Sequence, residues 1–293
     1  MGVSTVGSSI KAVFPRWSEI LGLDADLVGH DLPLWADRAR YRAVVAELRD
    51  DPRCVGALVT SHKIGLYQAA ADMFTGMDEF AVACGEISSV RVRDGQVFGA
   101  AKDPLTAGLS LEEVLAENHF VDGAEVLCFG GGGAGTAIGW YLGRRRHPPH
   151  RIRFVDVRAE RLELLRSVLV DRSLHTEVTT ALAGALDVAR LVECLPPHSL
   201  VINATGMGKD LPGTPLPKAA VLPREAVVWE LNYRGSLEFL SQARSQAGAR
   251  GLTVVDGWRY FIHGWSQVIA EVFDLELTGD VVERLSAAAE EAR

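Results

Sequence analysis

The sequence predicts an α/β protein of two domains, the second of which is built on a doubly wound parallel sheet. Three observations lead to this fold class. The chain has 293 residues, enough for about two domains of ordinary size. A glycine-rich segment, 130–135, lies between a short apolar run and a helix-like stretch. Beyond it, strand-like and helix-like segments alternate, as a doubly wound sheet requires.

The first hundred residues indicate a mixed α/β unit of their own. Asp94–Gly95 predicts a tight hairpin turn, because both central positions of such a turn need positive φ. A first helix is expected to begin near Pro15 and to end at Gly22, since proline suits a first turn and glycine a helix end. The expected strands are 4–8, 25–29, 55–60, 85–93 and 96–101, and the other expected helices are 41–49 and 64–74.

The second unit is expected to follow a connecting helix at 104–117. Two helices, 260–273 and 280–291, come after its last strand and are expected to pack back on the first unit. The predicted domains are therefore 1–104, completed by 259–293, and 105–258. The expected strands of the second domain are 126–129, 152–157, 177–180, 200–204, 227–231 and 253–255.

The glycine-rich segment fits G-x-G-x-x-G, with its glycines at Gly130, Gly132 and Gly135. Between a strand and a helix, these glycines permit a tight turn, close approach of a pyrophosphate, and close packing of helix on strand. The N–H groups at the helix start then bind phosphate charge. A flexible loop without a ligand is the alternative. We predict a Rossmann-type domain whose cofactor contacts include Gly130, Gly131, Gly132, Gly133, Ala134 and Gly135.

Asp156 ends the second expected strand of this domain. It follows the glycines by about twenty residues, the place where an acid binds the hydroxyl groups of the adenosine ribose. The alternative role is an N-cap for the next helix, because aspartate caps helices well. The two roles are compatible, and we expect the ribose contact.

Composition and charge exclude several classes of protein. The formal net charge is −8, without a long basic run, so no nucleic-acid partner is expected. The four cysteines show no C-x-x-C spacing, which suits a reducing cytoplasm, and no metal site is predicted. No apolar stretch reaches the length of a membrane span, and the N-terminus lacks a signal-peptide pattern. A cytoplasmic protein without a membrane partner is expected.

Two charged residues are candidates for proton transfer. Lys63 follows the apolar run 54–60, and a lysine just past a buried strand can lie beside the sheet. A lone lysine is nevertheless more often a solvated surface residue, and His62 beside it is more often packed than catalytic. Asp103 precedes Pro104, so it could also be the N-cap of the connecting helix.

Several motifs carry a resemblance to a known family. Residues 60–63, TSHK, are similar to T-x-P-H-K but one residue shorter and without the proline. Residues 99–103, GAAKD, keep the glycine and the aspartate of G-x-N-T-D. The glycines at 130–134 are similar to G-A-G-G-A, residues 203–205 match N-A-T, and Tyr233 follows the fifth strand. In the order of these motifs, the chain resembles the shikimate/quinate dehydrogenase family along nearly its whole length.

The resemblance implies roles for individual residues. It implies that Lys63 is the catalytic acid/base and Asp103 its partner, in a substrate-binding N-terminal domain. The implied substrate contacts are Ser8, Ser9, Thr60, Ser88, Tyr233 and Gln267. The implied cofactor contacts beyond the glycine loop are Asp156, Arg158, Arg161, Asn203, Ala204, Thr205 and Gly257.

The departures from the family pattern lie where the family holds its substrate. S-x-S-P is only loosely echoed at 8–11, and two ring-binding asparagines become Ser88 and Ala101. The glutamine of the C-terminal motif falls on Gly264, with Gln267 three residues later. We therefore expect a small polyhydroxylated ring substrate, a carboxylate, but not shikimate. A monomer or a homodimer is expected.

The implied reaction is hydride transfer between a ring hydroxyl or ketone and a nicotinamide. Lys63 would move the proton, with desolvation lowering its pKa toward working pH and Asp103 raising it. NAD is expected over NADP, because the Asp156 carboxylate repels a 2′-phosphate. Arg158 and Arg161 leave NADP possible, since guanidinium groups pair with phosphate.

Two other functions remain open from the sequence. A non-catalytic sensor could bind a ring acid and a nucleotide on the same fold, although it would not need the pair Lys63 and Asp103. A methylene-tetrahydrofolate dehydrogenase-like enzyme shares the two-domain plan, but the segments 60–63 and 203–205 fit it less well.

Overall fold

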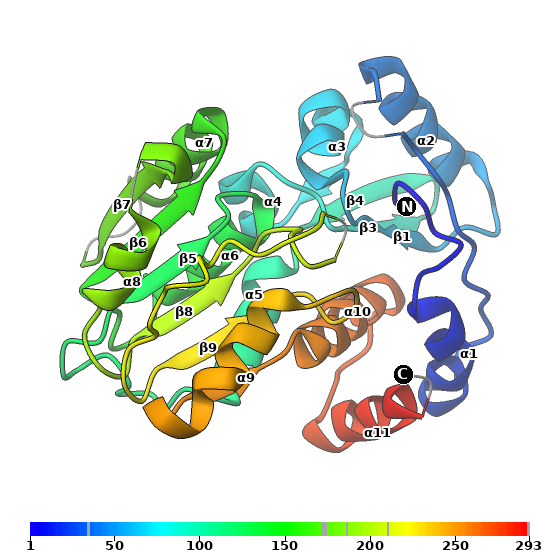
Figure 1. Cartoon of the computed structure of the whole chain (residues 1–293). Coiled ribbons are helices and arrows are strands. Elements are labelled where there is room, and N and C mark those ends of the chain that lie inside the picture. Colours follow the sequence, from blue (N-terminus) through cyan, green and yellow to red (C-terminus); the bar gives the residue numbers. More distant parts are fainter. Residues whose placement is uncertain (34–35, 171–174, 186, 210, 292–293) are drawn as a thin grey trace. The chain divides into compact units, whose positions relative to one another are not determined.

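The computed structural model describes residues 1–33, 36–170, 175–185, 187–209 and 211–291 and confirms the α/β class (Figure 1). The chain divides into two compact units, Met1–Thr106 with Ile262–Arg293, and Ala107–Phe261. The helices α5 (Asp103–Glu112) and α10 (Trp258–Phe273) each contain a boundary between the units. No helix in the described ranges combines the length and the apolar character that a membrane crossing needs.

Unit 1 contains a four-stranded mixed sheet in the order β1-β3-β4-β2. The strands β3 and β4 form the predicted hairpin, in which Asp94 and Gly95 have φ values of 51° and 69°. The strand β2 pairs in parallel with β4, and β1 is antiparallel to β3. The bounds are β1 Gly56–Leu58, β2 Gly76–Met77, β3 Ser89–Arg93 and β4 Gln96–Ala100.

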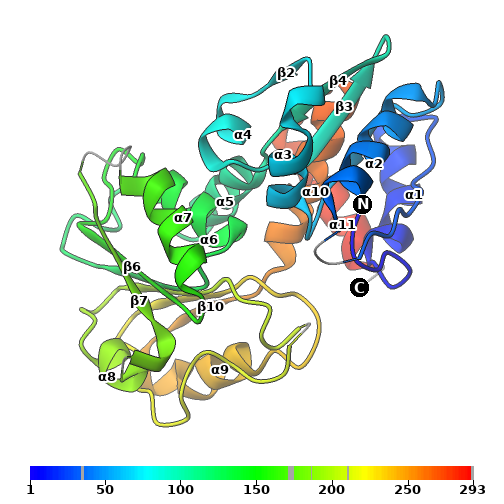
Figure 2. The same ribbon diagram turned by 90° about the horizontal axis from the view of Figure 1, so that it is seen from above.

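Helices α2 (Arg38–Asp50) and α3 (Lys63–Ala70) lie side by side and bury apolar side chains against this sheet (Figure 2). Val45 of α2 and Leu66 of α3 belong to one buried cluster with Val90 of β3. A 3-10 turn, Ala71–Met73, extends α3. The first residue of α3, Lys63, follows the end of β1 after the short segment 59–62.

The C-terminal helix α11 (Gly279–Glu290) packs on α1 (Ile10–Leu21) within unit 1. The indole Nε1 of Trp17 donates a hydrogen bond of 2.8 Å to the Leu285 carbonyl oxygen. The helix α1 ends at Gly22 as predicted, but it begins five residues before Pro15. Proline therefore lies inside this helix rather than in its first turn.

Two expected strands of unit 1, 4–8 and 25–29, are wrong, and α4 (Glu79–Cys84) was not predicted. Only an isolated bridge joins Gly2 to Asp31 in this region. Val6 and Val28 are 80% and 81% exposed, so neither segment has an apolar face to bury. An alternating apolar pattern forms a strand only where one face packs on a core.

Unit 2 contains a six-stranded parallel sheet in the order β10-β9-β8-β5-β6-β7. This is the doubly wound order, and it confirms the Rossmann-type prediction. All six predicted strands form. Their bounds are β5 Val126–Phe129, β6 Arg151–Asp156, β7 Glu177–Leu182, β8 Leu200–Asn203, β9 Val227–Glu230 and β10 Thr253–Val255.

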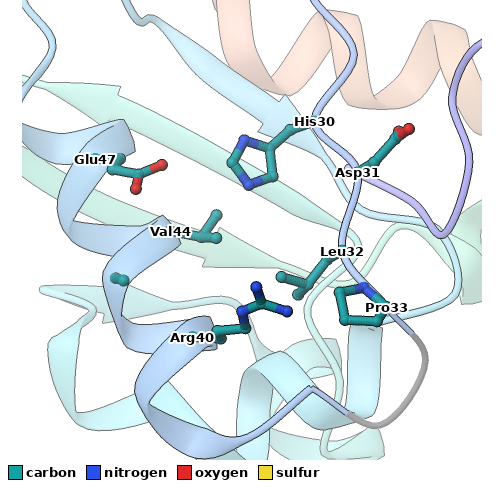
Figure 3. A pocket seen from close by; sticks show the side chains of 8 residues that line it. His30, Asp31, Leu32, Pro33, Arg40, Val44 and Glu47 are labelled. Atoms are coloured by element: carbon teal, nitrogen blue, oxygen red, sulfur yellow. The ribbon is translucent and has the colours of Figure 1, made fainter.

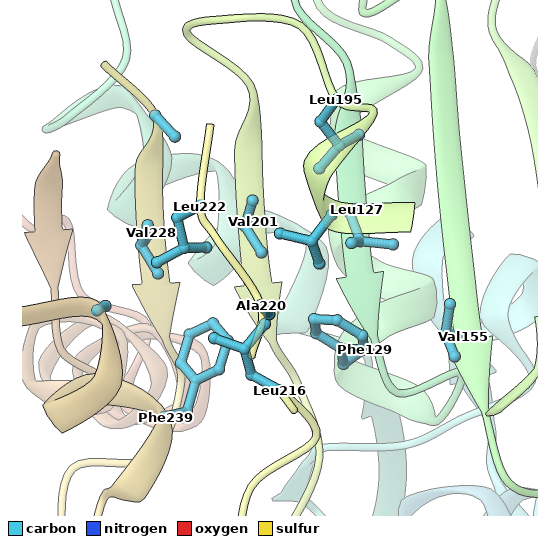
Figure 4. Close-up of a cluster of buried hydrophobic side chains, with 13 residues drawn as sticks. Leu127, Phe129, Val155, Leu195, Val201, Leu216, Ala220, Leu222, Val228 and Phe239 are labelled. Carbon is cyan, nitrogen blue, oxygen red and sulfur yellow. The ribbon is translucent and has the colours of Figure 1, made fainter. Parts of the chain in front are cut away.

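Helices cover both faces of this sheet, with α6 and α7 on one side and α8 and α9 on the other (Figure 2). Phe239 of α9 packs with Leu127, Phe129 and Val201 in one buried cluster (Figure 4). The bounds are α6 Gly133–Leu142, α7 Ala159–Leu169, α8 Val188–Glu193 and α9 Glu238–Arg250, with a 3-10 turn at Ala183–Ala185. The strand order reverses between β5 and β8, where ligands of such sheets bind at the carboxyl ends.

Candidate functional site

Lys63 and Asp103 form an ion pair within unit 1. Lys63 is the first residue of α3, and Asp103 is the first residue of α5, directly after β4. The Lys63 ammonium donates a hydrogen bond to Asp103 Oδ2. The two side chains are 23% and 10% exposed. The structure therefore brings the predicted proton-transfer residues together in a largely desolvated place.

The electrostatic surroundings raise the pKa of Lys63. Burial lowers this pKa, but the charges of Asp103 and Glu86 and the hydrogen bond to Asp103 outweigh burial, so the net shift is upward. Burial and Asp103 thus act in the two opposite directions that were predicted, and the balance between them lies on the side of the carboxylates. Lys63 is an ammonium group at neutral pH, ready to donate a proton.

Glu86 was missed by the sequence analysis. It follows Gly85 at the end of α4, is 1% exposed, and has a pKa raised to about 8, chiefly by burial and then by Asp103. No hydrophobic periodicity marks the position. The available clue was an acidic residue in an otherwise apolar and glycine-flanked segment, since a buried charge needs a partner.

The serines and the threonine predicted to contact substrate lie in unit 1 with different surroundings. Ser8 and Ser9 are half-buried at the start of α1, and the Ser9 side chain does not cap that helix. Thr60 is exposed and donates to the Met1 carbonyl at 3.2 Å. Ser88 is buried, and its hydroxyl accepts from the Lys102 amide at 2.7 Å and donates to the Ala100 carbonyl. Backbone partners thus already occupy Ser88.

Gln267 lies half-buried on α10, one turn before Glu271. Residues four apart share one face of a helix. Glu271 accepts a hydrogen bond of 2.6 Å from the Lys102 ammonium. Lys102 is thereby paired within the chain, and its charge is neutralised locally. His62 is packed as expected, 2% exposed, with Nδ1 3.0 Å from the Tyr41 hydroxyl.

The glycine loop of unit 2 follows β5 and leads into α6. Gly130 has a φ of 104°, and a Cβ there would lie 2.7 Å from the Ala204 carbonyl oxygen. A Cβ at Gly135 would lie 2.1 Å from the Gly130 carbonyl oxygen. At Gly132, the N-cap of α6, a Cβ would meet no described atom within 4 Å. The first and third glycines are therefore required by packing, while the second leaves the loop open to a ligand.

Asp156 ends β6, and its carboxylate holds the glycine loop. Oδ2 accepts from the Gly131 amide at 2.7 Å, and Oδ1 accepts from the Arg158 amide at 2.9 Å. Arg161 approaches Oδ2 at 3.8 Å. The N-cap residue of α7 is Arg158, so Asp156 does not cap that helix. The carboxylate lies beside the glycine loop, and the ribose contact stays a prediction.

Asn203 ends β8, and Ala204 and Thr205 follow it beside the glycine loop. A polar network holds this segment. Asn203 Oδ1 accepts from the Thr205 hydroxyl at 2.6 Å, and Asn203 Nδ2 donates to Glu230 Oε2 at 2.8 Å. Glu230 ends β9, is fully buried, and has a pKa raised to about 7 by burial. Asn232 donates to Glu230 Oε1 from its amide and from Nδ2. The sequence analysis missed Glu230, although an acid inside an apolar run was visible.

Tyr233 and Gly257 lie at the same end of unit 2. The ring of Tyr233 packs against Phe261 at 4.7 Å and Trp258 at 5.6 Å between centroids. A Cβ at Gly257 would lie 1.9 Å from the Leu231 carbonyl oxygen. Backbone packing therefore explains glycine at this position.

A pocket of about 320 Å³ lies elsewhere in unit 1, between α2 and the preceding segment (Figure 3). It is lined by His30, Asp31, Leu32, Pro33, Arg40, Ala43, Val44 and Glu47. None of the predicted site residues lines it. Within the described ranges, no group of His, Cys, Asp and Glu side chains could hold a metal ion.

Comparison with known proteins gives a consistent result. The shikimate dehydrogenase (NADP(+)) of Sphingopyxis alaskensis is 30% identical over 265 residues, which cover 88% of this chain and 83% of that protein. The shikimate dehydrogenase (NADP(+)) of Thermococcus kodakarensis is 30% identical over 192 residues, 64% of this chain and 62% of that protein. A scan against protein-family profiles finds no match.

Solved structures share the fold. Shikimate 5-dehydrogenase from Thermus thermophilus, in complex with NADP(H) and shikimate, has a TM-score of 0.75 at 21% identity. The match covers 100% of this chain and 97% of the Thermus chain. Quinate dehydrogenase from Corynebacterium glutamicum, in complex with NAD, has a TM-score of 0.73 at 20% identity, with 99% and 96% covered. The 30% identical relative shows that the chain belongs to the shikimate dehydrogenase family of NAD(P)-dependent dehydrogenases.

Proposed function

We propose that this dehydrogenase interconverts a ring hydroxyl and a ring ketone on a polyhydroxylated cyclohexane or cyclohexene carboxylate, with NAD preferred over NADP. The observation that carries the proposal is the Lys63–Asp103 ion pair in unit 1. A pair that is mostly removed from solvent, with one ammonium and one carboxylate, supports proton transfer to or from a substrate oxygen.

The chain's part in the reaction is the movement of one proton. In oxidation, the carbinol carbon loses a hydride, the hydroxyl loses a proton to the Lys63 amine, and a C=O bond forms. In reduction, the Lys63 ammonium returns the proton to the oxygen. The nicotinamide, when bound, accepts or supplies the hydride. Because the pKa of Lys63 is raised, reduction is favoured at neutral pH and oxidation at alkaline pH.

The substrate is proposed to differ from shikimate. In segment 99–103, Ala101 stands where the family motif G-x-N-T-D has asparagine, and its side chain is 0% exposed. An alanine cannot donate a hydrogen bond to a ring hydroxyl, and a lost polar partner changes discrimination strongly. Ser88, at the other such position, is engaged with backbone groups.

NAD preference is supported by Asp156, whose carboxylate lies beside the glycine loop. The curated relatives carry NADP(+) in their names. We therefore expect the cofactor choice of this chain to differ from theirs, because a carboxylate at the end of the second strand repels a 2′-phosphate.

The test is cofactor reduction, followed by absorbance at 340 nm, across a panel of cyclitols and cyclohexene acids with NAD and with NADP. The expected result is a best substrate other than shikimate, used with NAD. Shikimate turnover equal to that of the best panel member would overturn the proposed substrate class. The Lys63→Ala variant, assayed with the same substrate, tests the proton-transfer role separately.

A further inference from the structure

Glu86 is a third acid beside the Lys63–Asp103 pair, and the reaction just described does not use it. It is 1% exposed and lies one residue after the left-handed Gly85 that ends α4. The next residue, Ile87, donates its amide to the Lys63 carbonyl oxygen at 3.1 Å. The segment that carries Glu86 therefore runs along the start of α3, where Lys63 lies.

The carboxyl group of Glu86 is incompletely satisfied. Among the described residues, Glu86 Oε1 has no hydrogen-bond partner, although it is buried. A buried polar atom without a partner is unfavourable for folding. Glu86 carries this cost beside the proposed catalytic pair, where unfavourable polar burial commonly has a functional reason.

Several charged groups act on Glu86. Lys63 on α3 and Asp103 on α5 both interact with it electrostatically, as does Asp78, the N-cap residue of the preceding helix α4. Lys102 and Glu271, paired with each other, act on Asp78. One ammonium is thus shared by two nearby acids, Asp103 through a hydrogen bond and Glu86 through its charge.

We propose that Glu86 is a positioning residue that sets the charge state of Lys63, holding it as an ammonium at alkaline pH and so favouring ketone reduction over alcohol oxidation. The inference rests on the proposed proton-transfer role of Lys63. Its physical basis is that a negative charge near an ammonium group stabilises the protonated form, typically by about one to three pKa units.

The first experiment does not depend on activity. The chain has five lysines (Lys11, Lys63, Lys102, Lys209 and Lys218), so the titration of each can be followed by ¹³C NMR of the labelled Cε carbons. The Lys63 signal is assigned by its loss in Lys63→Arg. In Glu86→Gln, the midpoint of the Lys63 titration should fall by about one pH unit.

The matched control is Glu79→Gln, the same change at an exposed position in the first turn of α4. It should leave the Lys63 midpoint unchanged. Glu86→Ala serves as the second variant if glutamine at this buried position prevents folding. A Lys63 midpoint that moves no further in the Glu86 variants than in Glu79→Gln would overturn the inference.

The second experiment measures kcat for ring-alcohol oxidation against pH. The ascending limb should move to lower pH in Glu86→Gln, giving up to about a tenfold gain at a fixed pH on that limb, since one pKa unit is a factor of ten in free amine. A limb that stays in place while the Lys63 midpoint moves would show that Lys63 does not carry the proton. In that case the proposed function fails, while Glu86 still tunes Lys63.

Discussion

Replacing Asp156 by asparagine tests the cofactor preference most directly. The change keeps the shape of the side chain and removes one negative charge. That side chain is 4% exposed, so its charge is poorly screened by water. We expect the variant to use NADP better and NAD less well than the unmodified enzyme.

The expected size follows from Coulomb's law. For a carboxylate and one phosphate charge about 5 Å apart, the repulsion is about 1–3 kcal/mol for effective dielectric constants between that of water and about 20. Removing it should raise kcat/KM for NADP by about 5- to 150-fold. Use of NAD should fall by a smaller factor, because a neutral oxygen accepts a weaker hydrogen bond from the ribose hydroxyl.

The variant also carries a structural cost. Asp156 accepts from the amides of Gly131 and Arg158 with different oxygens, and asparagine offers only one acceptor oxygen. One amide therefore loses its partner, at a cost of about 1–3 kcal/mol in the free energy of unfolding. Urea unfolding of the variant measures this cost independently of the assay.

The assay is a pair of kcat/KM values, with NAD and with NADP, on one ring substrate. The control is Asp187→Asn, the same substitution at the exposed N-cap of α8 in the same unit. A starting enzyme that prefers NADP would refute the reasoning. So would a cofactor ratio that moves no more in Asp156→Asn than in Asp187→Asn.

Three other predictions concern individual residues. Lys63→Ala should lower kcat by about 10²–10⁴-fold, and its NAD affinity, measured by calorimetry, should be unchanged. The control Lys218→Ala, at an exposed position, should retain full turnover. Normal turnover in Lys63→Ala would remove the acid/base assignment. The pKa of Glu230 is raised from 4.5 to about 7. Between these pH values the folded chain therefore holds a proton that the unfolded chain has released. The free energy of unfolding should consequently fall by about 3 kcal/mol as pH rises from about 4.5 through 7. Denaturant unfolding of Glu230→Gln across this range should give a flatter pH dependence, and an unchanged slope would contradict the prediction. Gly257→Ala should lower the thermal midpoint by several degrees, because its Cβ would lie 1.9 Å from the Leu231 carbonyl oxygen; an unaltered midpoint would show that the backbone there adapts freely.

The secondary structure of unit 2 was accessible from the sequence because its signals are local. Strands such as β5 and β8 are buried on both faces, so each is a short continuous apolar run, bounded by glycine or polar residues. The glycine spacing and the acid at Asp156 likewise lie within one strand–loop–helix unit and its neighbouring strand. In unit 1 the same kind of evidence failed at 4–8 and 25–29. Whether Val6 or Val28 is buried depends on what packs against it, and the structure leaves both exposed.

The sequence by itself determined the fold class, the glycine loop and the identities of Lys63 and Asp103 as candidates. Only the tertiary structure decided their electrostatics. The pKa of Lys63 depends on Glu86, which comes from the segment between α4 and β3, and on how far burial opposes the two carboxylates. Spacing along the chain carries no information about either quantity, because charge interactions depend on distance in space and on exclusion of water. The sequence therefore named the two opposing effects on that pKa, and only the folded protein decided that the net shift is upward.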